Sequence, residues 1–278
     1  MICAVCQSPA SHWAVVDGHE FSHCPVCGSV ALNIEQMHAI DDGASTRIYN
    51  ADYWESEARA ARERSWGGSL ARAAEAIYVC QRPVRSFLDI GSGDGSLLDA
   101  LSYHLPSFSE RLIGIELFPP ETHTQHQGYQ RGSVADLDMS VDCGVCVEVI
   151  EHLTPHMLRG LLRGLASKSK VNSCFLFNTG MGDYVLSEDA SYIDPVNRGH
   201  IVSYGLTALQ TIFGEFGFRV STLGSRAWAF IAEYQPTEPF DLASRTWRPM
   251  PQNTAVLDDA RSGSLMAIIA RESLRAYA

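Results

Sequence analysis

Apolar and polar positions along the chain follow two different periods. Short apolar runs, typical of buried strands, are separated in several places by segments with the apolar spacing of amphipathic helices. This alternation is typical of an α/β protein in which helices cover both faces of a mostly parallel sheet. We expect helices at residues 48–80 (interrupted at 66–68), 96–103, 155–165 and 205–216, and strands at 87–90, 111–117, 129–134, 143–149, 173–177, 218–223, 228–234 and 264–270.

The two ends of the chain have less regular patterns. We place the last strand of the sheet at residues 264–270 and interpret the polar, Pro-rich residues 235–263 as an insertion. Residues 33–47 are interpreted as a polar linker, and Ser69 as the N-cap of a helix. Aromatic side chains in the helical segment before the first strand either pack in the core, which we favour, or form a lid over a ligand pocket (Tyr53, Trp54 and Trp66).

A glycine-rich turn at residues 91–95 (GSGDG) joins the first predicted strand to the next helix. Glycines permit a sharp turn and the close approach of a ligand, and the helix that follows offers unpaired backbone N–H groups. The turn lacks the Gly-Lys-Ser/Thr ending of a phosphate-binding loop, and Ser96 stands where a dinucleotide fold has its third glycine. Asp89, just before the turn, suits a cationic ligand group. Glu116, 21 residues after Gly95, ends a strand where related folds place a carboxylate for ribose hydroxyls.

The first 32 residues contain four of the eight cysteines of the chain. They form two C-x-x-C pairs, Cys3/Cys6 and Cys24/Cys27, separated by 17 residues. Each pair can chelate one ion from a tight turn, and two such pairs supply the four thiolates of a structural Zn²⁺ site. The alternative is two unrelated turns with buried thiols. We therefore predict a zinc ribbon at residues 1–32.

Composition narrows the choice of partners and compartment. The formal net charge is −11 and no dense Lys/Arg cluster occurs, so nucleic acid is not the expected partner. No apolar run approaches the roughly 18 residues of a membrane span. The first ten residues lack the pattern of a secretory signal, and we expect a cytoplasmic protein whose thiols stay reduced.

The motifs together resemble those of the S-adenosylmethionine-dependent methyltransferases with a seven-stranded Rossmann-like sheet. The resemblance rests on DIGSGDG, GIEL, GSVADL and CVEVIEHL and covers residues 87–218. It implies the strand order 3-2-1-4-5-7-6. It also implies that Asp89 and the glycine turn (Gly91, Ser92, Gly93, Gly95) hold the amino-acid end of S-adenosylmethionine, that Glu116 with the adjacent Leu117 holds the ribose, and that Ser133 and Val134 flank the adenine. The ribbon, the linker and the DYW segment resemble the zinc-ribbon branch of this family, which acts on small molecules and glycans.

Ionisable residues after the fourth predicted strand are candidates for the chemistry. A neutral His152 could deprotonate a hydroxyl group as a general base. The pattern Glu148-x-x-Glu151-His152 also resembles ubiquinone-pathway O-methyltransferases and small-RNA 3′-end 2′-O-methyltransferases, where such residues hold a divalent ion such as Mg²⁺; His200 stands where the RNA enzymes add a histidine. A third interpretation is that these residues only shape the pocket. All three stay open at this point.

The sequence thus predicts an S-adenosylmethionine-dependent methyltransferase that acts on a hydroxyl group of a small molecule or sugar conjugate. An RNA 3′-end 2′-O-methyltransferase and a non-catalytic zinc-ribbon scaffold are the alternatives. We expect the ribbon at residues 1–32, a linker and helical lid at 33–82 and the methyltransferase domain at 83–278. The acceptor would be selected by residues 48–66, 181–200 and the insertion.

Overall fold

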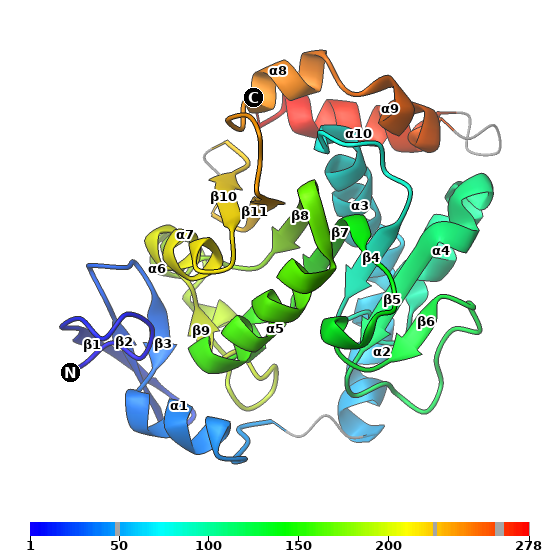
Figure 1. Cartoon of the computed structure of the whole chain (residues 1–278). Helices are drawn as coiled ribbons and strands as arrows, with labels where there is room; N and C mark the ends of the chain where they lie inside the picture. The colour runs from blue at the N-terminus through cyan, green and yellow to red at the C-terminus, as the bar shows by residue number, and fades with distance from the viewer. Residues whose placement is uncertain (48–50, 225–226, 259–263, 278) are drawn as a thin grey trace.

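The computed structural model describes residues 1–47, 51–224, 227–258 and 264–277. A seven-stranded sheet forms its centre, with helices on both faces, and a small four-stranded sheet formed mostly by the N-terminal residues lies beside it (Figure 1). The expected α/β class is confirmed. The expected start of the helical region, Ile48 to Asn50, lies outside the described residues.

The central sheet has the order β10-β11-β8-β7-β4-β5-β6. Counted along the chain within this sheet, that is the predicted order 3-2-1-4-5-7-6. The strand β11 is antiparallel to both of its neighbours, and the other pairs are parallel. The strands are β4 (Phe87–Ile90), β5 (Leu112–Glu116), β6 (Tyr129–Arg131), β7 (Val141–Val147), β8 (Ser169–Asn178), β10 (Phe218–Thr222) and β11 (Ala229–Tyr234).

Neighbouring residues of one strand point to opposite faces of the sheet and into two separate cores. Leu88 and Phe175 belong to one core, together with α5 (Pro155–Lys168), α7 (Leu206–Gly214) and the N-terminal sheet. Phe87 and Leu176 belong to the other, together with α3 (Gly68–Val79) and α4 (Ser96–His104). The N-terminal residues therefore share an apolar core with one face of the central sheet.

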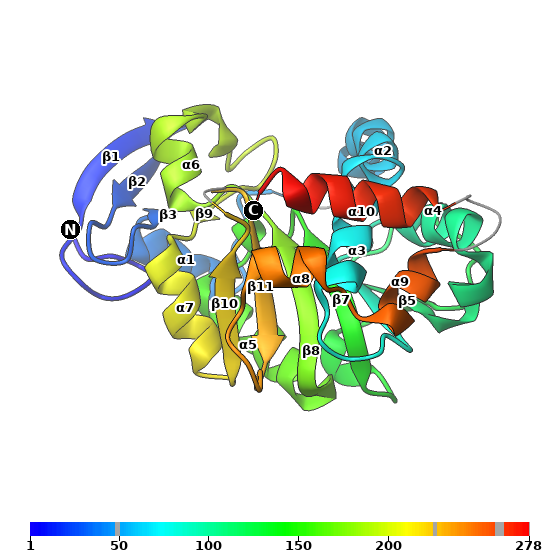
Figure 2. The same ribbon diagram turned by 90° about the horizontal axis from the view of Figure 1, so that it is seen from above.

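The C-terminal residues form helices, so the predicted strand at residues 264–270 is wrong. Helix α10 (Leu265–Arg275) buries Met266, Ala270 and Leu274, which are four residues apart and lie on one helical face. This face packs on α3, and β11 is the seventh strand instead. The expected insertion contains α8 (Leu242–Trp247) and α9 (Pro251–Leu257), which lie with α10 along the same side of the molecule (Figure 2).

The N-terminal sheet has the order β1-β2-β3-β9. Its first three strands are β1 (Ser11–Val16), β2 (His19–His23) and β3 (Val30–Leu32), whereas β9 (Val202–Ser203) comes from the second half of the chain. The expected linker contains α1 (Ile34–Asp41), which buries Met37. This small sheet thus joins the first 32 residues to the segment just before α7.

The two helices expected directly before the first central strand are present. They are α2 (Ala51–Ser65) and α3, and the N-cap of α3 is Gly67, so the predicted Ser69 cap is wrong; Ser69 is buried inside the helix. Helix α3 packs against β7 and β8. No helix within the described ranges is long and apolar enough to cross a membrane.

Candidate functional site

The glycine turn after β4 requires its glycines for two separate reasons. Gly91, Gly93 and Gly95 have φ of 69°, 55° and 79°, in the left-handed region that side chains disfavour. A Cβ atom on Gly91 would also lie 2.5 Å from Cγ2 of Val149, and one on Gly95 would lie 2.1 Å from Cγ2 of Thr124. The turn therefore contacts the segment after β7 directly.

Two buried carboxyl groups flank this turn. Asp89 on β4 is 4% exposed and Glu116 at the end of β5 is 9% exposed. The Glu116 carboxylate accepts hydrogen bonds from the backbone N–H groups of Gly93 (3.0 Å) and Phe118 (2.9 Å). Burial, together with the charge of Glu116, raises the pKa of Asp89 to about 8, and burial also raises the pKa of Glu116. Such sites favour a cationic or hydrogen-bond-donating ligand.

The other predicted donor-binding residues differ in their surroundings. Leu117 is exposed and Val134 is buried. The backbone N–H and the hydroxyl of Ser133 both donate to the Asp136 carboxylate at 2.7 Å, an acid that the motif did not single out. The buried hydroxyl of Ser92 has no hydrogen-bond partner among the described residues.

The aromatic residues of the preceding helices separate into two groups. The ring of Trp54 lies 3.6 Å from the position of a Cβ on Gly93, so this indole contacts the glycine turn. Its buried Nε1 has no hydrogen-bond partner among the described residues. Trp66 is 44% exposed and lies against Tyr103 and His104. Trp54 thus lies against the glycine turn, whereas Trp66 is a surface residue, so the favoured core placement is wrong for Trp66.

Glu148 follows β7 directly and has an unusual backbone. Its φ is 54°, which is rare for a residue with a side chain and is often found at functional sites. Its carboxylate accepts from Nδ2 of Asn178 (3.2 Å) and from the hydroxyl of Tyr192 (3.3 Å), and lies 3.5 Å from a guanidinium nitrogen of Arg198. Burial and the nearby Glu151 raise the pKa of Glu148 to about 8.

Glu151, His152 and His200 form a compact group whose ligand atoms all lie within 4.8 Å of one another, with Glu151 and His200 buried and His152 half-buried. Nδ1 of His152 is 3.1 Å from the carbonyl oxygen of Gly199, and Nδ1 of His200 is 2.7 Å from that of Tyr192. A carbonyl only accepts, so both Nδ1 atoms carry the proton and both Nε2 atoms are acceptors. Burial lowers the pKa of His152 to about 4 and also lowers that of His200.

One oxygen of the Glu151 carboxylate stands out in this group. Oε2 accepts from the hydroxyl of Thr179 at 2.9 Å, but the buried Oε1 has no hydrogen-bond partner among the described residues. Oε1 lies 3.8 Å from Nε2 of His200, too far for a hydrogen bond. Two acceptors that face each other in a buried site favour a cation or a proton between them. Glu148 does not belong to this compact group, so three of the four predicted ligands are brought together.

The four N-terminal cysteines converge as their spacing predicted. The Sγ atoms of Cys3 and Cys27 are 3.7 Å apart, and those of Cys6 and Cys24 are 3.6 Å apart. Four sulfurs at about 2.3 Å from a central Zn²⁺ in a tetrahedron would lie about 3.8 Å from one another. These two distances match a zinc site, and all four sulfurs lie within 4.8 Å of one another.

The cysteine ribbon packs directly on the segment that carries His200. A Cβ on Gly205 would lie 2.1 Å from the carbonyl oxygen of Cys27, and the hydroxyl of Ser29 accepts from the backbone N–H of Gly205 at 2.9 Å. The backbone N–H of Ile201 donates to the carbonyl oxygen of Glu151 at 3.0 Å. Residues 201–205 are thus held between the ribbon and the Glu151 segment.

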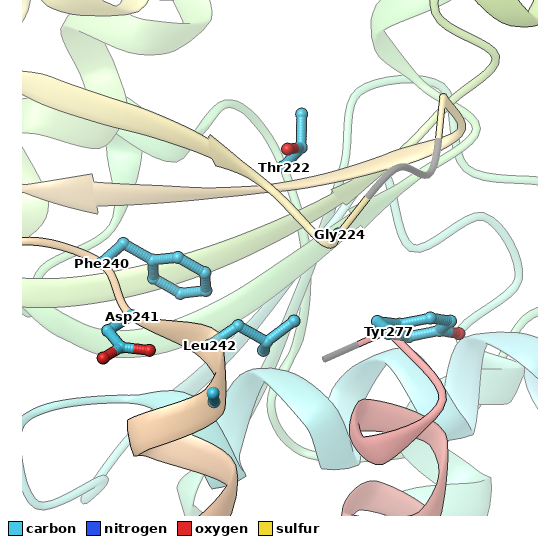
Figure 3. A pocket seen from close by; sticks show the side chains of 7 residues that line it. Thr222, Gly224, Phe240, Asp241, Leu242 and Tyr277 are labelled. Atoms are coloured by element: carbon cyan, nitrogen blue, oxygen red, sulfur yellow. The ribbon is translucent and has the colours of Figure 1, made fainter.

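A cavity of 530 Å³ opens beside Glu148. It is lined by acidic, aromatic and amide side chains and one arginine, most of which the motifs did not identify: Glu148, Asn178, Gly180, Tyr184, Glu188, Asp189, Tyr192, Arg198 and Trp228. A second cavity of 390 Å³ lies elsewhere, with Phe240 and Leu242 on one side and Tyr277 on the other (Figure 3). No predicted site residue lines the second cavity.

Comparisons with known proteins gave one family model and several similar solved structures. A family model described as a methyltransferase domain matches residues 58–223. Among solved structures, the chain is similar to one chain of the complex between the Haloferax volcanii Trm112 methyltransferase activator and a methyltransferase. The two chains are 16% identical, the match covers 68% of this chain and 100% of that chain, and the TM-score is 0.46. It is also similar to CalS10, an amino pentose methyltransferase from Micromonospora echinaspora, with 14% identity, coverage of 67% and 98%, and a TM-score of 0.46. A search of curated proteins gave no match.

Proposed function

Because the chain belongs to the methyltransferase-domain family, whose model matches 58–223, we propose that it transfers a methyl group from S-adenosylmethionine to a hydroxyl group of a small molecule or sugar conjugate. One observation carries this proposal. The glycine turn with its buried acids, Asp89 and Glu116, touches Val149, and Val149 follows Glu148 at the edge of the 530 Å³ cavity. The proposed donor site and the proposed acceptor cavity are thus adjacent at the end of β7.

The chain's own residues account for binding and orientation of the donor. Asp89 would accept from the ammonium group, and Glu116, already held by two backbone N–H groups, would accept from the ribose hydroxyls. Val134 and Ser133 would lie beside the adenine, and Trp54 would cover the turn. The donor supplies its own leaving group, a sulfonium, so alignment and removal of one proton are what remains for the protein.

Glu148 is the residue best placed to accept the proton of the acceptor hydroxyl. Its carboxylate lines the cavity, whereas Glu151 and His200 are buried behind it. Asn178, Tyr192 and Arg198 fix its position through the contacts described above. His152, whose Nδ1–H is directed at Gly199, keeps Nε2 as an acceptor and is the alternative base.

Calorimetry with S-adenosylmethionine tests the donor half of the proposal. We expect binding, and we expect Glu116→Ala to lower the affinity by at least about tenfold because two ribose hydrogen bonds to a charged group are lost. The matched control is Glu110→Ala, which removes an exposed acid just before β5 and should bind normally. Absence of binding by the wild-type protein at millimolar donor would leave only the scaffold interpretation.

A specific observation favours a second, metal-dependent form of the reaction. Glu151, His152 and His200 present three acceptors within 4.8 Å, and each imidazole directs its Nδ1–H at a carbonyl oxygen, as metal-binding histidines commonly do. A divalent ion such as Mg²⁺ held there would lower the pKa of a bound hydroxyl. This set is also the feature that supports the RNA 3′-end 2′-O-methyltransferase alternative.

Metal binding can be measured without an acceptor. Calorimetric titration of the zinc-loaded protein with Mn²⁺ should show one site that Glu151→Gln abolishes and Glu110→Gln preserves. A wild-type protein that binds no Mn²⁺ at millimolar concentration would rule out the metal-dependent form and leave the protein-only base.

A further inference from the structure

We propose that the 530 Å³ cavity binds a cationic acceptor, one that carries an amino group held by Glu188 and Asp189 while its hydroxyl lies at Glu148. The inference rests on the proposed function and names the chemical class of its acceptor. Three features of the cavity support it: its connection to the donor turn, its charge and its aromatic walls.

The cavity opens at the strand ends where the methyl group would be delivered. Glu148 comes directly after β7, Asn178 is the last residue of the adjacent β8, and both line the cavity. The next residue, Val149, contacts the glycine turn at Gly91. A molecule in the cavity with a hydroxyl at Glu148 would therefore lie next to the donor site.

Carboxylates dominate the charge of the cavity lining. Three carboxyl groups face one guanidinium, that of Arg198. Arg198 lies 3.5 Å from Glu148 and its guanidinium is 5.3 Å from the centre of the Tyr192 ring, so it is already engaged. Within the part of the chain that the structure describes, Glu188 and Asp189 form no ion pair. The unbalanced charge of the cavity lining is thus negative and lies on Glu188 and Asp189.

Asp189 is held in place independently of any ligand. Its Oδ1 accepts from the backbone N–H of Ser191 at 3.0 Å and from the Ser191 hydroxyl at 2.5 Å. Glu188 is the preceding residue and ends α6 (Gly182–Ser187) as its C-cap. Two carboxylates adjacent in sequence that line one cavity, one of them fixed, offer an ammonium group charge-assisted hydrogen bonds.

Aromatic walls add to the preference for a cation. Tyr184 and Tyr192 pack edge to face, with ring centres 5.7 Å apart and planes at 89°, and Trp228 is a further wall. Aromatic ring faces attract cations and repel anions. Two of these rings already hold a cation, because Arg198 lies 5.3 Å from the centre of the Tyr192 ring and Arg72 lies 4.7 Å from that of Trp228. An acceptor with a phosphate or carboxylate group would meet both the acids and these faces, which also counts against a polyanionic acceptor such as RNA.

Three phenols of nearly equal size test the charge preference directly. Tyramine, tyrosol and 4-hydroxyphenylacetate present the same hydroxyl and ring, and carry a positive, a zero and a negative charge. Their binding is measured by calorimetry to protein saturated with S-adenosylhomocysteine. We expect tyramine to bind at least about tenfold more tightly than tyrosol, the factor of one charge-assisted hydrogen bond, and 4-hydroxyphenylacetate to bind most weakly.

Variants then assign the preference to the two acids. The double variant Glu188→Gln/Asp189→Asn should bind tyramine and tyrosol equally, with tyrosol affinity unchanged. Asp183→Asn, an exposed acid on α6 that does not line the cavity, is the matched control and should keep the preference. Equal affinity for the three probes, tighter binding of the anion, or no tyramine binding at 10 mM would each overturn the inference. The donor titration decides the proposed function separately, because S-adenosylmethionine binding does not depend on the charge of the acceptor.

Discussion

Replacing Gly205 with alanine should separate the cysteine ribbon from the catalytic segment. Gly205 is the N-cap of α7 with φ −75° and ψ 156°, an extended conformation that any residue can adopt. The glycine is therefore required only for space. A Cβ there would lie 2.1 Å from the carbonyl oxygen of Cys27 and 2.6 Å from Cα of Gly28.

The size of the effect follows from which atoms collide. They belong to the backbone beside a predicted zinc ligand, so they cannot rotate away, and the ribbon must shift by about 1 Å to reach ordinary contact distance. Overpacking of this kind typically costs about 1–3 kcal/mol, and we expect the upper end. For a protein of this size, a loss of about 3 kcal/mol lowers Tm by roughly 6–12 °C.

Thermal unfolding and amide exchange test this reasoning together. The amides of Leu32 and Gly182, which donate to Ile201 and Tyr204, should lose protection in Gly205→Ala, while donor affinity stays unchanged. Gly214→Ala on the same helix is the matched control, because its Cβ meets nothing within 4 Å; it should be neutral or stabilise by up to about 1 kcal/mol. If both variants melt like the wild type, the ribbon does not brace α7.

Three further predictions concern the metal and donor sites. Cys24→Ser should remove the zinc measured by elemental analysis and lower Tm in a single transition, because the ribbon shares its core with the central sheet; wild-type protein purified without zinc would refute the site. Donor affinity should rise about tenfold per pH unit towards pH 8, because the pKa of Asp89 in the free protein is raised to about 8 and an ammonium group binds only the ionised carboxylate; it should fall again where the donor's own ammonium group loses its proton. In calorimetry, the Asp89→Asn variant should bind the donor weakly and its affinity should not rise with pH. If the rise with pH is retained, a group other than Asp89 causes it. Gly95→Ala should lower donor affinity by more than about tenfold, because Gly95 has φ 79° and the new Cβ would lie 2.1 Å from Cγ2 of Thr124. Circular dichroism checks that the fold is kept.

The position of the two acids beside the glycine turn could be predicted because both belong to short buried strands. Asp89 and Glu116 follow apolar runs, and the order of parallel strands brings their carboxyl ends to one edge. The cysteine pairs were equally predictable, because metal coordination imposes the C-x-x-C spacing. In both cases one local constraint dictates the residue types.

Two predictions are wrong because a local pattern does not show where a helix lies: the strand at residues 264–270 and the N-cap at Ser69. Residues 264–270 are apolar enough for a strand, but the burial of Met266 and Ala270 follows the helical spacing of four. A short apolar run does not distinguish the two, and packing on α3 decides for the helix. The Ser69 cap fails similarly, because the helix begins earlier, after Gly67, and buries the serine.

The acceptor side could not be predicted, because its residues are positioned by contacts distant in sequence. Tyr192 and Arg198 reach Glu148 from a segment with no strand or helix pattern, and β9 within it has only two residues. That segment is held in place by its contacts with the N-terminal ribbon, which its own pattern of apolar residues does not reveal.

The ribbon and the cavity are therefore parts of one arrangement. The backbone of β9 pairs with β3 of the ribbon, and Ile201 beside it donates to the carbonyl oxygen of Glu151. His200 directly precedes Ile201, and its Nδ1–H is bonded to the carbonyl oxygen of Tyr192, a wall of the cavity. A displacement of the ribbon would thus reach both the histidine pair and the acceptor wall, while the glycine turn on β4 would keep its own supports. It follows that a protein whose four N-terminal cysteines hold no metal should retain more of its donor affinity than of its acceptor affinity.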